Sequence, residues 1–204
     1  VGALQSIFND FDDVEATLYH QITSERIRVI EVLQKKVSGN AKEKLIQQYL
    51  FDHLWLLDPM WERATETPVM EQAVEKEFKK IRAKLSPEER KGRLDIKYKT
   101  TAGAHVIVEL KRPNVKIKTL QLIEQVNKYK AALQKCLEAT QMEKDTIEIV
   151  CVLGSNPQDF NDQGHQNALR VYNVRIVLYN SLLDQAYKSY SSYLDKNKHT
   201  GRLT

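Results

Sequence analysis

Two acidic residues and a lysine are spaced so that they could bind a metal ion and act on a phosphate group. Residues 106–113 read VIVELKRP, which places Glu109 and Lys111 in a stretch that otherwise has the composition of a buried β-strand. Side chains alternate along a strand, so Glu109 and Lys111 share one face while Val108 and Leu110 share the other. Asp95 precedes Glu109 with 13 residues between them. Whether Asp95 joins this face depends on how two strands pair.

The stretch 94–111 is predicted to be a β-hairpin. Residues 94–99 alternate apolar and polar side chains, and the segment that follows contains Gly103 and is typical of a turn. A three-residue turn over 101–103 is a favoured class, and it would place Asp95 opposite Glu109 on the same face. A four-residue turn would place Asp95 on the other face, so the cluster depends on this register.

A cluster of this composition favours magnesium chemistry. Two neighbouring carboxylates repel each other unless a cation lies between them. Magnesium binds one or two carboxylates together with water and substrate phosphates, and manganese could substitute for it. Lys111 could then neutralise charge developing on the phosphorus. The alternative is an ordinary salt bridge on a solvated sheet face. Ile107 shares the face of Glu109 and makes that alternative less favourable, because charges among apolar side chains are costly.

The remaining pattern predicts an α/β fold. Helical periodicity covers residues 24–37, 42–57, 71–85, 118–138 and about 183–194, and strand-like runs cover 61–69, 146–153 and 175–179. The run at 146–153 is mostly apolar, which indicates a strand covered on both faces. Together with the hairpin, this order predicts a mixed β-sheet flanked by helices, with a helical N-terminal extension.

Composition excludes few functions. The net charge of +4 permits a polyanionic partner without requiring one. No apolar run has the length of a membrane helix, and acidic residues stand where a signal peptide would be basic and apolar. Cys136 and Cys151 lack zinc-site spacing and are expected to be small buried side chains in a reducing compartment. We therefore expect a cytoplasmic protein without a membrane partner.

The hairpin residues resemble the PD-(D/E)XK nuclease superfamily. The resemblance rests on GRLD at 92–95, ELK at 109–111, and a following helix with QVNKY at 125–129. The proline that usually precedes the first acidic residue is absent. EKLIQQYLFDHLWLLDP at 43–59, VELKRP at 108–113 and RIVLYNSLLDQAYKSYSSYL at 175–194 look like the C-terminal nuclease domain of the Shedu family. This second resemblance spans about 40–195 and is diffuse outside the hairpin.

The resemblance implies a restriction-endonuclease-like core that cuts DNA with magnesium, in bacterial anti-phage defence. Asp95 and Glu109 would hold the metal, and Lys111 would be the catalytic lysine. Glu43 matches an acidic residue that such nucleases often place on their first helix, as a further metal ligand or water-binding group. RNA as a substrate is not distinguished from DNA by the charge pattern.

Two further positions have alternative interpretations. Glu43 lies in line with Ile46 and Leu50 on its helix, yet it could instead complete a capping box with Asn40. Gln125 lies on the predicted sheet-facing stripe of its helix and could position Lys111 or a metal-bound water. Its alternative role is a hydrogen bond to backbone. Tyr129, on the same stripe, is expected to belong to the core.

Basic residues gather around the hairpin and predict contact with a phosphate backbone. The candidates for nucleic-acid binding are Arg93, Lys97, Arg112, Lys116 and Lys118. No base-reading motif is present, so the sequence gives no basis for inferring a sequence specificity.

The chain is predicted to divide into a helical extension at 1–39, a nuclease-like domain at 40–195 and a basic tail at 196–204. The extension carries an apolar seam at alternating spacings of three and four, formed by Leu4, Ile7, Phe11, Val14, Leu18 and Ile22. The seam could pack on its own domain, link to an upstream domain, or make the protein a homo-oligomer. The alternative to a nuclease is a non-catalytic module that binds nucleic acid or oligomerises on the same fold.

Overall fold

The computed structural model describes residues 2–58, 69–70, 96–99, 104–139 and 146–199. The chain forms two compact units, Val37–Leu182, and Val1–Lys36 together with Leu183–Thr204. The predicted helix at 71–85 and the predicted strand at 61–69, except Val69, lie outside the described residues. The division groups the chain from Leu183 onward with the N-terminal helix, whereas the predicted nuclease-like domain extended to 195.

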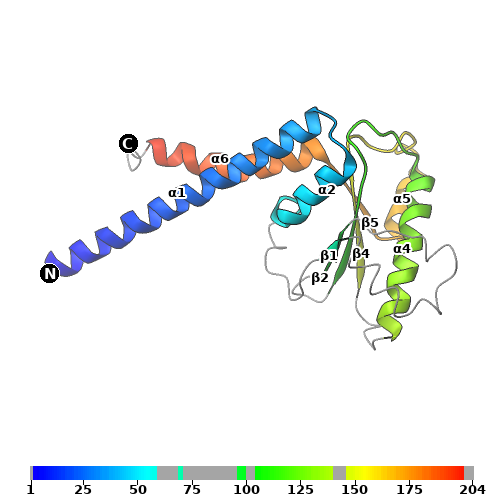
Figure 1. Ribbon diagram of the computed structural model, residues 1–204, viewed down its shortest axis with the longest axis horizontal. Coiled ribbons are helices and arrows are strands. Elements are labelled where there is room, and N and C mark those ends of the chain that lie inside the picture. The colour runs from blue at the N-terminus through cyan, green and yellow to red at the C-terminus, as the bar shows by residue number, and fades with distance from the viewer. Residues whose placement is uncertain (1, 59–68, 71–95, 100–103, 140–145, 200–204) are drawn as a thin grey trace. The chain divides into compact units, whose positions relative to one another are not determined.

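The unit Val37–Leu182 contains a mixed five-stranded sheet in the order β1-β2-β3-β4-β5 (Figure 1). The strands are β1 (Val69–Met70), β2 (Ile96–Lys99), β3 (His105–Leu110), β4 (Ile147–Leu153) and β5 (Val174–Leu178). The first three strands pair antiparallel, and β3, β4 and β5 pair parallel. The predicted mixed sheet is confirmed, and its parallel part explains why β3 and β4 read as apolar runs, since helices can cover both faces.

The pairing of β2 with β3 has the register that a three-residue turn predicts. Ile96 faces Val108 and Lys99 faces His105, with Lys97 and Tyr98 in step between them. Residues 100–103 of the turn lie outside the described residues.

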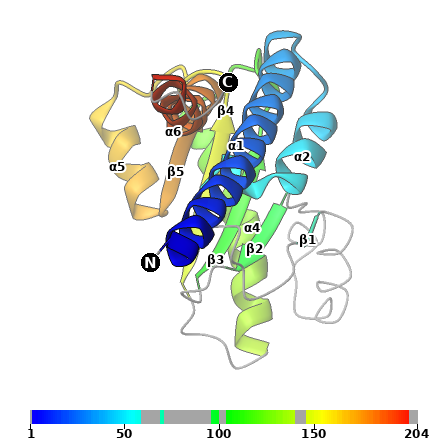
Figure 2. The same ribbon diagram turned by 90° about the vertical axis from the view of Figure 1, so that its left-hand side faces the viewer.

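Helices lie on both faces of this sheet. The helices α4 (Thr119–Ala139) and α5 (Gln163–Val171) lie on one face, and α2 (Glu43–Asp52) lies on the other (Figures 1 and 2). The predicted stripe of α4, including Leu122, Val126 and Leu133, is buried against Ile149 and Cys151 of β4. This packing confirms the helical period read from the sequence and the burial predicted for Cys151.

Two elements differ from the sequence expectation. The predicted helix 42–57 ends at Asp52, because His53 has non-helical backbone angles (φ −136°, ψ 56°), and a 3-10 turn, η1 (Leu54–Leu56), follows. The helix α5 was not predicted. It has nine residues and a single buried side chain, Leu169, which is too few apolar positions for a visible period. The available signal was Asp162, whose side chain accepts from the backbone N–H of His165 as an N-cap.

The second unit contains the helix α1 (Gly2–Ser38) and the part of α6 (Tyr179–His199) that starts at Leu183. These helices run antiparallel (Figures 1 and 2), and the Arg26 guanidinium lies 6.0 Å from the centre of the Tyr190 ring. No helix in the described part of the chain is long and apolar enough to cross a membrane.

The loops that follow β3 and β4 are in close contact. A Cβ atom added to Gly154, directly after β4, would collide with the backbone carbonyl of Pro113 in the loop after β3. Only glycine permits this approach. The two loops at the carboxyl ends of the parallel strands are therefore held together by their backbones.

We predict that Gly154→Ala destabilises the protein by about 2 kcal/mol or more, because backbone atoms must move to accept the methyl group. The free energy of unfolding in urea measures this change. Gly164→Ala is the matched control, since its new Cβ would meet the Asp162 side chain at 3.0 Å and no backbone. Equal stability of the two variants would contradict the close approach.

Candidate functional site

Glu109 is a buried carboxylate held by two neighbouring side chains. Its Oε1 accepts hydrogen bonds from Lys111 Nζ at 2.6 Å and from Gln125 Nε2 at 2.5 Å. The Glu109 side chain is 3% exposed and that of Lys111 14%. The salt bridge of Glu109 with a lysine that the alternative predicted is present, but all six residues of β3 are buried, so the predicted solvated sheet face is wrong. The alternation that put Glu109 and Lys111 on one face is confirmed by their contact.

The backbone of Lys111 is fixed from two sides. Its N–H donates to the Val152 carbonyl at 3.0 Å, which continues the parallel ladder one residue past β3. Its carbonyl accepts from the Tyr179 hydroxyl at 2.9 Å. Tyr179 is buried, and a buried tyrosine needs a partner for its hydroxyl. Tyr179 was not among the site residues predicted from the sequence, where its only signal is a tyrosine at the junction of a strand and a helix.

Gln125 connects Glu109 to the core of α4. Its side-chain amide nitrogen lies 2.5 Å from Glu109 Oε1 and 3.3 Å from the Tyr129 hydroxyl. Tyr129 is buried in the core cluster, as predicted, and also supplies this polar contact. Gln125 therefore contacts a side chain of the candidate site. Its partner is Glu109, whereas the sequence predicted Lys111, a metal-bound water or the backbone.

Glu43 occupies a different position. It is a half-buried residue in the first turn of α2, and this helix lies on the face of the sheet opposite α4 (Figures 1 and 2). Within the described chain, its side chain makes no hydrogen bond or ion pair. The capping-box alternative is wrong, because Lys42 is the N-cap and no side chain caps this helix. Asn40 instead has a positive φ of 48°.

Of the two strand carboxylates that were predicted to hold a metal, Glu109 is the one that the structure describes. Asp95 lies outside the described residues. Over the ranges that the structure describes, no group of three or more His, Cys, Asp or Glu side chains could hold a metal ion. A carboxylate such as Glu109 is the kind of oxygen ligand that magnesium prefers. A complete magnesium site would need further ligands in addition to Glu109.

Three of the predicted basic residues lie in the loop between β3 and α4. Arg112, Lys116 and Lys118 are all exposed. Arg112 donates to the Asn40 carbonyl at 3.0 Å, and Lys116 donates to the Ser155 hydroxyl at 2.9 Å. Arg93 lies outside the described residues, and of Lys97 only the backbone in β2 is described. The exposed charges thus directly follow Lys111 in the chain.

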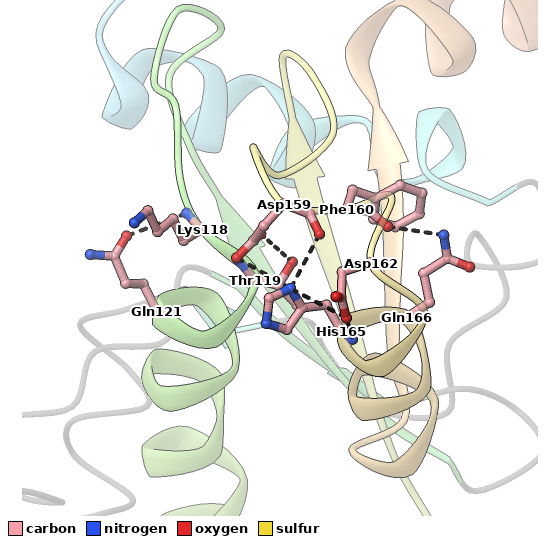
Figure 3. Close-up of polar contacts among 8 residues, drawn as sticks. All are labelled: Lys118, Thr119, Gln121, Asp159, Phe160, Asp162, His165 and Gln166. Carbon is pink, nitrogen blue, oxygen red and sulfur yellow. Dashed lines mark hydrogen bonds and ion pairs between the residues drawn. The ribbon is translucent and has the colours of Figure 1, made fainter.

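This basic loop is anchored at its end by Asp159, from the loop after β4 (Figure 3). Asp159 Oδ1 accepts from the Thr119 backbone N–H at 2.8 Å and from the Thr119 hydroxyl at 2.7 Å. His165 of α5 places its Nδ1 3.4 Å from Asp159 Oδ2. The two Thr119 hydrogen bonds, backbone first, lower the pKa of Asp159 below its usual value, with a smaller contribution from His165.

Comparison of the chain with protein-family profiles, curated proteins and solved structures gave no match. The geometry of the residues therefore carries any assignment of function.

We predict that Lys111→Met costs about 3–5 kcal/mol of stability, because it leaves the charge of Glu109 buried without its cation. The double variant Glu109→Gln/Lys111→Met removes both charges and should recover most of this loss. Arg175→Met is the matched control. It breaks the half-exposed pair between Arg175 and Glu148 on neighbouring strands and should cost about 1 kcal/mol or less. Urea unfolding that gives equal costs for the two single variants would contradict the buried pair.

Asp159 should make stability depend on pH at the acidic end. Its pKa is lowered in the folded state, so its contribution is fully present above its unfolded pKa of about 3.9 and is lost as pH falls through the lower folded value. Wild-type protein should therefore exceed Asp159→Asn in unfolding free energy at pH 6, and this difference should shrink as pH falls below about 3.9. A difference that stays constant from pH 6 to pH 2.5 would contradict this origin.

Proposed function

We propose that this chain is a magnesium-dependent nuclease that hydrolyses phosphodiester bonds of DNA, built on a PD-(D/E)XK, restriction-endonuclease-like core. The observation that carries the proposal is the buried Glu109 carboxylate, held by Lys111 and Gln125 where β3 ends. The carboxyl ends of parallel strands are the usual place for a functional site in sheets of this kind.

Stability alone gives a poor reason for this arrangement. Removing two charges from water is costly, and well-packed apolar side chains of similar size are often as stable or more stable. β3 is apolar at its other positions except His105, which shows that apolar side chains fit this strand. A carboxylate and a lysine kept in such a strand are better explained by chemistry than by stability.

The proposal places Asp95 beside Glu109. The described pairs of β2 and β3 keep one register, from Lys99 with His105 to Ile96 with Val108. If the same register continues by one residue, Asp95 is opposite Glu109, where both carboxylates can bind one ion. Bound magnesium would supply a Lewis acid for a phosphate oxygen and would lower the pKa of water.

Lys111 and Gln125 have distinct roles in this proposal. The ammonium of Lys111 is a fixed positive charge beside Glu109, and it stabilises negative charge that develops on a phosphate in the transition state. Gln125 is a positioning residue, because its amide holds Glu109 Oε1 and is itself held near the Tyr129 hydroxyl. Glu43 is kept as a candidate for a further metal ligand on the sequence resemblance alone.

The exposed basic loop supplies a surface for the phosphate backbone. Arg112, Lys116 and Lys118 follow the candidate site directly, and Lys116 and Arg112 are oriented by Ser155 and Asn40. Such contacts position a nucleic acid without reading its bases. The choice of DNA and a role in anti-phage defence rest on the sequence resemblance.

A cleavage assay tests the proposal. Purified protein should cut linear, nicked, single-stranded or supercoiled DNA, or RNA, when magnesium is present, and EDTA should stop cleavage. Glu109→Gln and Glu109→Gln/Lys111→Met should reduce the rate by about 100-fold or more while circular dichroism shows a retained fold. Glu148→Gln, a strand glutamate on β4 paired with Arg175, should cut like wild type.

The same assay separates the nuclease from a non-catalytic nucleic-acid-binding module. The basic loop alone would support binding, since it needs no metal. Salt-sensitive binding without cleavage of any substrate would favour the module and contradict the nuclease. Cleavage by Glu109→Gln at the wild-type rate would show that another site is responsible.

A further inference from the structure

The helix α1 has an apolar seam that is exposed in the structure. The side chains of Val14, Leu18 and Ile22 are 58%, 54% and 54% exposed, and Val32 is exposed as well. These residues fall within one narrow arc of the helix at 3.6 residues per turn. The face that carries the buried Ile30 and Leu33 lies further around the helix. The exposed seam thus borders the buried face of α1, with Ile22 on the side nearer to Leu33.

α6 does not extend along the whole of α1. α1 has 37 residues and α6 has 21, so a segment of at least 16 residues of α1 has no part of α6 beside it. Helices of about 12–15 residues are marginal alone in water, and packing of an apolar face normally supplies their stability. The length of α1 and its exposed seam therefore indicate a partner for this helix.

The order of seam positions in the sequence is symmetric. The seam positions are Leu4, Ile7, Phe11, Val14, Leu18, Ile22, Glu25, Val29 and Val32. Their spacings read three, four, three, four from Leu4 to Leu18, and the same in reverse from Leu18 to Val32. If a second copy of this helix packs antiparallel, with the two Leu18 residues opposite each other, every seam residue of one helix faces a seam residue of the other. Glu25 is the one polar position, and its carboxylate pairs with Arg28 at 2.9 Å on its own helix.

The charges of α1 are divided between its two ends. Residues 2–25 contain five acidic residues and no lysine or arginine, whereas residues 26–38 contain four basic residues and one acidic residue. Antiparallel pairing about Leu18 would bring Asp10 of one helix beside Arg28 of the other, at the positions that flank the seam. Parallel pairing would instead bring acidic Asp10 beside acidic Glu15.

We propose that α1 is a dimerisation helix, which forms an antiparallel coiled coil with α1 of a second copy of this chain. The apolar seam supplies the association, and the opposite charges of the two ends fix the direction. Leu18 lies at the centre, where it faces Leu18 of the second copy. The inference does not depend on the proposed nuclease activity.

Sedimentation equilibrium of the full chain tests the dimer. Wild type should be a dimer at micromolar concentration, and Leu18→Glu should weaken dimerisation at least about 100-fold, because the substitution places two carboxylates face to face. Leu45→Glu on α2 is the matched control, since Leu45 is also 54% exposed, and it should leave the dimer unchanged. Circular dichroism checks that both variants remain folded. A wild-type monomer at all concentrations, or equal behaviour of the two variants, would overturn the proposal.

Charge exchange tests the direction of the pairing. Asp10→Lys and Arg28→Glu should each weaken the dimer by about tenfold, and the double variant should restore it, because each change occurs twice in the symmetric pair. A parallel dimer would respond differently, since Asp10→Lys alone would then tighten it. Tightening by Asp10→Lys, or failure of the double variant to recover, would overturn the antiparallel arrangement.

Discussion

The buried carboxylate of Glu109 is the constraint on which the rest of the candidate site depends. A charge at this depth is costly unless it is paired and hydrogen-bonded. Lys111 and Gln125 meet that requirement at one oxygen, with N–O distances of 2.6 Å and 2.5 Å. The lysine can do so because its backbone is fixed at both ends, by the β4 ladder and by the Tyr179 hydroxyl. The strand β3, the helix α4 and the Glu109–Lys111 ion pair thus stabilise one another.

The two loops at the carboxyl ends of β3 and β4 extend this arrangement to the surface. Gly154 allows the backbone of one loop to contact Pro113 of the other, and Asp159 binds the first residue of α4, Thr119. These contacts hold the exposed basic residues of the loop after β3 close to the end of that strand. The rigidity of a polar site of this kind comes from backbone contacts as much as from side chains.

The sequence predicted the features that depend on local pattern. Alternation predicted that Glu109 and Lys111 share a face, the expected three-residue turn predicted the register of β2 with β3, and the helical stripe predicted that Gln125 faces the sheet. Features that depend on contacts between distant segments were not predicted. The Tyr179 hydroxyl reaches Lys111 across 68 positions and Asp159 reaches Thr119 across 40, and neither distance leaves a periodic signal. The short helix α5 was missed because one buried residue defines no stripe.

The central claim is that Glu109 belongs to a metal site, and a magnesium titration followed by calorimetry measures this without any assumption about substrate. Wild-type protein should give a saturable binding isotherm, and Glu109→Gln, which keeps the size of the side chain and removes its charge, should abolish it. The control variant Glu148→Gln should bind magnesium like wild type. An isotherm unchanged in Glu109→Gln, or the absence of binding to wild type by magnesium and manganese alike, would contradict the account.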